Sequence, residues 1–136
     1  MARLTSLRVM TDDPRRLVEF YETVTGLTAQ WSTEDFAELV TSSFILAIAH
    51  TRTLARLGAG TVLAGENRSV IIEFLVEDVD QAYERLRALI SEFVLEPTTQ
   101  PWGNRSILFR DPDGNLVNVF APASAETVQK YAAMRP

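Results

Sequence analysis

The sequence predicts an α+β protein in which one strand–helix–hairpin unit occurs twice. Two observations carry this prediction: each half has an amphipathic helix directly after a short strand, and the two helices align at a constant spacing. Asp78 follows Asp13 by 65 positions. The same spacing relates the apolar helix positions Leu17, Val18, Tyr21 and Val24 to Ala82, Tyr83, Leu86 and Leu89. A chance match of two amphipathic helices is the alternative that the pattern leaves open.

The first half begins with a strand over residues 7–10. Asp12 or Asp13 can cap the helix that follows, because a carboxylate accepts a hydrogen bond from the free backbone N–H groups of the first turn. Pro14 suits that first turn, and Gly26 ends the helix by entering the left-handed conformation. Strands over residues 36–40 and 44–49 follow, with a hairpin turn over 41–43 and then a connector over 51–68 that has a short helix at 54–57.

The second half begins with a strand over residues 70–76 and continues with a helix over 79–90. Asp78 and Gln81 form a variant of the capping box at the start of that helix. Two more strands, over 105–110 and 116–120, flank a turn over 111–115 that has proline early and glycine late. Asp111 and Asp113 are predicted to be turn residues. After Pro122 a C-terminal helix is expected, with Ser124 as its cap.

The composition excludes several classes of function. The chain of 136 residues has no cysteine, so disulfides, thiolate nucleophiles and sulfur-ligated metals are excluded. The net charge is −5 and no basic patch is present, which argues against a nucleic-acid partner. No apolar run is long enough to span a membrane and no secretion signal is recognisable, so we expect a cytoplasmic protein.

Four sequence segments together resemble the vicinal-oxygen-chelate superfamily, which contains glyoxalases, bleomycin-resistance proteins and extradiol dioxygenases. These segments are Phe20-Tyr21-Glu22-x-x-x-Gly26-Leu27, Phe74-Leu75-Val76-Glu77-Asp78-Val79-Asp80, Trp102-Gly103-Asn104-Arg105 and Asp111-Pro112-Asp113-Gly114-Asn115. The resemblance covers residues 5–121. It implies a single domain over residues 1–136 in which two βαβββ modules curl their mixed sheets into a cup: module 1 about 3–50, connector 51–68, module 2 about 69–121, and a C-terminal helix over 123–134.

In metal-dependent members of this superfamily, a histidine on the first strand and a carboxylate on the last strand of each module hold a divalent metal. Ser6 and Ile71 occupy the two histidine positions in this chain. Asn118 occupies one carboxylate position, and Ala47, or Ala49 if the hairpin register differs, occupies the other. None of these side chains supplies an imidazole or a carboxylate, so we expect a non-metal subgroup with no cofactor. The one histidine, His50, is expected to face away from the cup, because strand neighbours point to opposite faces.

Arg8 and Glu73 are the charged residues expected inside the cup, because they lie two residues after Ser6 and Ile71 and share their faces. They are interpreted as a pair that orients a polar ligand, with Glu73 also a candidate general base, or alternatively as a structural ion pair or as outward-pointing residues. Trp31 and Trp102 can stack on a planar or cationic ligand at the rim, with core packing as the alternative. The predicted ligand-binding set is therefore Ser6, Arg8, Trp31, Ala47, Ile71, Glu73, Trp102 and Asn118.

Three functions remain open from the sequence. The favoured one is a metal-free protein that binds a small organic molecule, an antibiotic among the candidates, in the cup. The alternatives are a lyase or dioxygenase with an atypical metal site or with Glu73 as general base, and a scaffold whose cup is filled by its own side chains. The resemblance also implies a homodimer, and whether the protein is an enzyme stays open.

Overall fold

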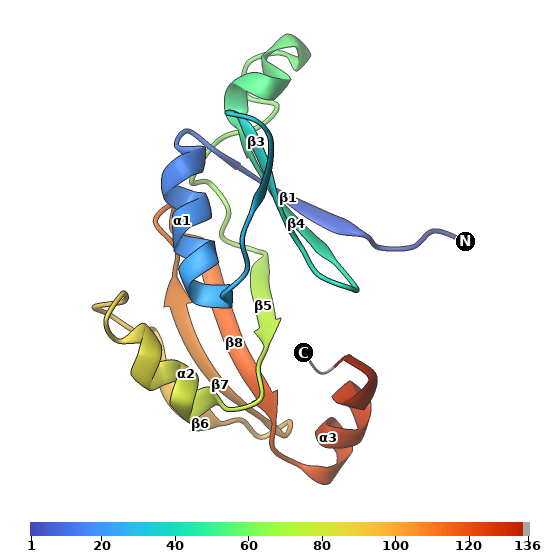
Figure 1. Cartoon of the computed structure of the whole chain (residues 1–136), viewed down its shortest axis with the longest axis vertical. Helices are drawn as coiled ribbons and strands as arrows, with labels where there is room; N and C mark the ends of the chain where they lie inside the picture. The colour runs from blue at the N-terminus through green and yellow to red at the C-terminus, as the bar shows by residue number, and fades with distance from the viewer. Residues whose placement is uncertain (135–136) are drawn as a thin grey trace. The chain divides into compact units, whose positions relative to one another are not determined.

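The computed structural model describes residues 1–134, so the last two residues of the predicted domain lie outside the described part of the chain. The chain forms two compact units (Figure 1). Unit 1 contains Met1–Asn67 together with Pro112–Gly114, and unit 2 contains Arg68–Asp111 together with the chain from Asn115 onward. Each unit has its own mixed four-stranded sheet.

Unit 1 has the predicted order of a strand, a helix and antiparallel strands. Its elements are β1 (Ser6–Thr11), α1 (Pro14–Thr25), β2 (Gln30–Thr33), β3 (Phe36–Val40), β4 (Ile45–His50) and the 3₁₀ helix η1 (Thr51–Leu57). The strand order is β1-β4-β3-β2, with β1 parallel to β4 and the other pairs antiparallel. Asp13 is the cap of α1, where its Oδ1 accepts a hydrogen bond from the Arg16 N–H at 3.2 Å, and Gly26 ends the helix at φ 76°.

Unit 2 has the same arrangement. Its elements are β5 (Ile71–Leu75), α2 (Val79–Leu86), β6 (Leu95–Thr99), β7 (Asn104–Arg110), β8 (Leu116–Pro122), α3 (Ala125–Tyr131) and the 3₁₀ turn η2 (Ala132–Met134). The strand order is β5-β8-β7-β6, with β5 parallel to β8. The α+β class with two βαβββ modules is therefore confirmed.

Helix α2 ends at Leu86, four residues before the predicted end, so that prediction is wrong. The backbone N–H groups of Leu89 and Ile90 both donate to the Leu86 carbonyl, at 3.0 and 2.8 Å. The Leu89 bond spans three residues where an α-helical bond spans four, so the chain tightens after Leu86. Apolar periodicity continues through this turn to the buried Ile90, and the sequence pattern therefore extends past the end of the helix.

Each sheet packs one face against its long helix. In unit 1 the buried Ala37, Leu39, Leu46 and Ile48 alternate along β3 and β4, and α1 contributes Leu17 and Tyr21, which have no exposed surface. In unit 2 Ile107, Phe109, Val117 and Val119 play the same part beneath α2. We call the other face of each sheet, which α1 or α2 does not cover, its open face.

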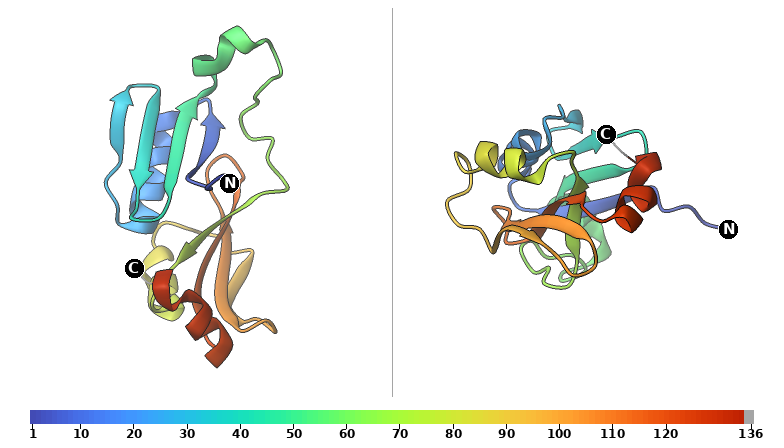
Figure 2. Two further views of the ribbon diagram at one scale, coloured as in Figure 1. Left: turned by 90° about the vertical axis from the view of Figure 1, so that its right-hand side faces the viewer. Right: turned by 90° about the horizontal axis from the view of Figure 1, so that it is seen from below.

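Helix α3 lies on the opposite side of its sheet from α2, as both views of unit 2 show (Figures 1 and 2). The Tyr131 ring contacts Phe120 of β8 edge to face, with 5.2 Å between centroids. Ser124 caps the helix, as predicted, and its side chain accepts a hydrogen bond from the Thr127 N–H. None of the helices within residues 1–134 is long and apolar enough to cross a membrane.

A single glycine fastens the start of α3 to the turn between β6 and β7. The Gly103 carbonyl accepts hydrogen bonds from the Ala123 N–H at 2.8 Å, the Ser124 N–H at 2.9 Å and the Thr127 hydroxyl at 2.8 Å. Three donors on one carbonyl hold the helix terminus in register with the sheet. The C-terminal helix thus belongs to unit 2 as a packed element.

Candidate functional site

The open face of the unit 1 sheet carries two oppositely charged residues in one cross-strand row. Arg8 of β1 pairs with Ala47 of β4, and Ala47 pairs in turn with Glu38 of β3. Paired residues share a face of the sheet, so Arg8 and Glu38 flank the small Ala47. The Arg8 guanidinium lies over the Phe36 ring, 5.3 Å from its centroid. Within residues 1–134 neither Arg8 nor Glu38 forms an ion pair, and Glu38 is half-buried.

The open face of the unit 2 sheet has the equivalent row, with Glu73 of β5, Asn118 of β8 and Leu108 of β7. The Asn118 Nδ2 donates a hydrogen bond to Glu73 Oε2 at 2.8 Å. The Asn118 Oδ1 is buried and has no hydrogen-bond partner in the described chain. Buried acceptors without a donor are uncommon in folded proteins, so this atom marks a place where a ligand or a water is expected to donate.

The register settles which alanine corresponds to Asn118. Arg8 pairs with Ala47 just as Glu73 pairs with Asn118, so Ala47, and not Ala49, is the equivalent position. Ala47 and Asn118 therefore occupy the same place in the two repeats. One repeat has a methyl group there, and the other has an amide.

Ser6 and Ile71 lie on the same open faces, two residues before Arg8 and Glu73. Ser6 pairs with Ile45 and Ile71 with Leu116. Both are exposed, with 48% of the Ile71 surface accessible. Six of the eight predicted ligand-binding residues thus lie on open faces: Ser6, Arg8, Ala47, Ile71, Glu73 and Asn118.

The two tryptophans lie elsewhere, and neither fills the core. Trp31 pairs with Ala37, a residue on the α1 side of the sheet, and the guanidinium of Arg15 in α1 lies 5.8 Å from the Trp31 ring. The register therefore directs Trp31 away from the open face. Trp102 lies in the turn between β6 and β7 and is 67% exposed. Neither side chain shares a cross-strand row with Asn118.

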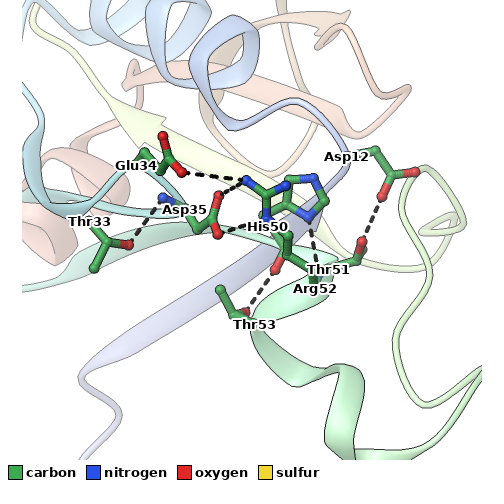
Figure 3. Close-up of polar contacts among 8 residues, drawn as sticks. All are labelled: Asp12, Thr33, Glu34, Asp35, His50, Thr51, Arg52 and Thr53. Carbon is green, nitrogen blue, oxygen red and sulfur yellow. Dashed lines mark hydrogen bonds and ion pairs between the residues drawn. The ribbon is translucent and has the colours of Figure 1, made fainter.

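A polar cluster at the end of β4 was not predicted from the sequence (Figure 3). Arg52 donates from Nε to Asp35 Oδ2 at 2.8 Å and from Nη2 to Asp35 Oδ1. The hydrogen bond from Arg52 lowers the pKa of Asp35 below its ordinary value. His50 pairs with the fully buried Thr11, which places it on the α1 side, as predicted.

His50 also has a structural role in this cluster. Its Nδ1 accepts a hydrogen bond from the Arg52 backbone N–H at 3.0 Å and so caps η1, which leaves only Nε2 of the ring for any other partner. Asp12, the alternative helix cap, accepts instead from the Thr51 hydroxyl at 2.7 Å. Asp12 and Asp35 are distant from residues 50–52 along the chain, so the grouping can be recognised only once the strand register is known.

Comparison with known proteins agrees with this geometry. Residues 3–119 match the Glyoxalase/Bleomycin resistance protein/Dioxygenase superfamily. The chain belongs to this superfamily. A glyoxalase/bleomycin resistance protein/dioxygenase from Nocardioides is 30% identical, and the match covers 92% of this chain and 86% of that one with a TM-score of 0.74.

Two further relatives of this superfamily member extend the comparison. The uncharacterized protein YraH of Bacillus subtilis is 28% identical over 124 residues, which cover 87% of this chain and 97% of YraH. A lactoylglutathione lyase from Agrobacterium tumefaciens is 23% identical, with 89% of this chain and 94% of that one covered at a TM-score of 0.69. At that identity the lyase shows a shared fold and no more.

The donor set does not fit the divalent metal of the superfamily's metal-dependent members. Ser6 and Ala47 in unit 1, and Ile71 and Asn118 in unit 2, stand at the four positions implied for ligands. Among residues 1–134 no group of three or more His, Asp or Glu side chains is arranged to hold a metal ion. The Asn118 amide is committed through Nδ2 to Glu73, and the remaining Oδ1 is a neutral oxygen that cannot offset a divalent charge.

Proposed function

We propose that this superfamily member binds a small organic molecule on its open sheet faces without a divalent metal. The observation that carries the proposal is the Glu73–Asn118 pair, in which a carboxylate orients an amide whose second polar atom is buried and unpartnered. Leu108 completes the row, and Phe120 lies two residues from Asn118 on the same face. A few placed polar groups among apolar neighbours are typical of small-molecule sites.

Two measurements on the full chain test this proposal. Elemental analysis of the purified protein should find no zinc, iron, nickel or manganese at one ion per chain, and a chelator should leave the melting temperature unchanged. A thermal-shift screen of metabolites and of planar and cationic antibiotics should find stabilising compounds, because a ligand at 100 times its Kd adds about 2.7 kcal/mol.

The variant Asn118→Leu keeps the side-chain size and removes the amide, so it should lose most of the ligand-induced shift. Gln81→Leu is the control, because it removes an exposed side-chain amide from α2, on the other side of the same sheet. A stoichiometric ion that only a chelator removes would contradict the metal-free part of the proposal. A screen with no stabilising compound would contradict the binding part.

A metal-free acid–base enzyme is the second candidate, because the Glu73 carboxylate is exposed and held in one orientation by Asn118. Glu73→Gln separates the two candidates. In a binding protein this change alters affinity alone. In an enzyme it abolishes turnover of a bound compound while binding persists.

A further inference from the structure

We infer that the Glu73–Asn118 pair recognises an organic cation with at least two N–H donors, such as an amidinium, a guanidinium or a protonated primary amine. This inference rests on the proposed binding function and adds the chemical class of the ligand. It follows from which hydrogen-bonding atoms of the pair are already used and which are left.

The chemistry of the two side chains fixes the orientation of the amide. An ionised carboxylate can only accept hydrogen bonds, so Asn118 must turn its NH₂ group toward Glu73. Its Oδ1 then points away from Glu73, into the buried position where no described residue donates to it. Glu73 Oε1 likewise accepts no hydrogen bond within residues 1–134. The atoms of the pair that lack a partner are therefore both hydrogen-bond acceptors, and a ligand must supply donors to them.

The charge on this face favours a cationic donor. Glu73 forms no ion pair in the described part of the chain. Arg110 shares the open face through its pairing with Leu116, but it already has a partner of its own. A neutral or anionic ligand would displace water from the Glu73 carboxylate without supplying a positive charge to replace that hydration. A cationic ligand supplies the charge, and N⁺–H···O⁻ hydrogen bonds are roughly twice as strong as neutral ones.

The two free acceptors of the pair distinguish cations that have N–H groups from quaternary ammonium ions. A quaternary ion offers charge to Glu73 and no donor to Asn118 Oδ1, so the buried acceptor would stay unpaired. A cation with two N–H groups has one donor for the carboxylate and a second for the amide oxygen. The half-buried Leu75 and Leu108 side chains share this face and offer an apolar surface for the body of the ligand.

Four small aromatic probes test the inference on the full chain: benzamidine, benzamide, benzoate and phenyltrimethylammonium. They differ in charge and in N–H donors while keeping one ring. Nuclear magnetic resonance titration, followed through the side-chain amide of Asn118 and the backbone amides of β5 and β8, gives the site and the Kd together. Benzamidine should bind at least about tenfold more tightly than each of the other three, given the strength of a charge-assisted pair.

Two variants and a matched control locate the effect. Glu73→Gln should weaken benzamidine binding about tenfold or more, and Asn118→Leu should weaken it to a similar extent. Glu84→Gln removes the same charge from the exposed surface of α2, on the other side of the same sheet, and should change the Kd less than about twofold. The amide spectrum of each variant reports whether it is folded.

Equal effects of Glu73→Gln and Glu84→Gln would overturn the inference, and so would equal affinities for benzamidine and phenyltrimethylammonium. If benzoate or benzamide shifts the Asn118 amide and benzamidine does not, the ligand class is wrong and the proposed binding function stands. If none of the probes and none of the screened compounds binds, both are wrong.

Discussion

Replacing Gly103 by alanine should destabilise unit 2 through two separate effects. Gly103 has φ +101°, a conformation that side-chain-bearing residues rarely adopt, and this strain costs about 1–2 kcal/mol. A Cβ at this position would lie 2.3 Å from Ser124 Oγ and 3.0 Å from both Ser124 Cβ and Thr127 Cγ2. Overpacking of this kind costs about 1–3 kcal/mol. The sum is about 2–5 kcal/mol.

Thermal unfolding and hydrogen exchange of the α3 amides are the assays. At about 4 °C per kcal/mol for a chain of this size, Gly103→Ala should lower the melting temperature by about 8–20 °C. If α3 detaches while the sheet remains folded, the Thr127 and Val128 amides should lose protection first. Either result reports the contact between the β6–β7 turn and the helix.

Gly60 provides the matched control, because it has φ +81° and a Cβ added there would meet no atom within 4 Å. Gly60→Ala should therefore show the backbone strain alone, about 1–2 kcal/mol. Adding Ser124→Gly to Gly103→Ala should restore part of the lost stability, since it removes the nearest clashing atoms and glycine remains an acceptable cap. If Gly103→Ala is no more destabilising than Gly60→Ala, the steric reasoning is refuted.

Two further predictions concern carboxylates of unit 2. The hydrogen bond from Arg105 lowers the pKa of Asp80 below 3.8. The stability that this pair contributes is therefore present above pH 3.8 and is lost as the pH falls through the lower, folded-state pKa. Urea unfolding midpoints measured from about pH 6 down to about pH 3 should fall less steeply in Asp80→Asn than in the wild type. The buried Asp111 accepts from the Asn115 N–H at 2.9 Å and from Asn115 Nδ2 at 2.8 Å, so Asp111→Ala should cost about 1–3 kcal/mol in chemical denaturation. Asp111→Asn keeps one acceptor, so its stability should lie between those of the wild type and Asp111→Ala. An Asp111→Ala variant as stable as the wild type would contradict the role of Asp111 in the turn.

Helix starts and the repeat could be predicted because their causes are local. The caps Asp13, Asp78 and Ser124 each accept a hydrogen bond from an N–H three residues later, so the interaction is contained within four residues of sequence. The Asp111 turn is equally local. In such cases the residue type and its spacing decide the structure before any tertiary contact forms.

Features that depend on strand register could not be predicted in the same way. Alternation gives which residues of one strand share a face, but it does not give the offset between two strands. The β2–β3 pairing is of this kind: Trp31 pairs with Ala37, which faces α1, and the register then shifts between Trp31 and Thr33. The Arg52–Asp35 and Arg105–Asp80 ion pairs join residues 17 and 25 positions apart, so they exist only once the sheets have formed.

The two repeats keep one backbone frame and differ in the row where chemistry is expected. In unit 1 the row Arg8–Ala47–Glu38 sets a cation and an anion on either side of a methyl group. In unit 2 the row Glu73–Asn118–Leu108 sets an anion against an amide and an apolar side chain. Backbone pairing constrains the frame in both repeats, whereas the side chains of this row differ in charge and polarity between them. The row can therefore diverge between the repeats while the backbone frame is kept. The divergence has a cost at Asn118, because its buried, unpartnered oxygen lowers stability unless a ligand or water donates to it.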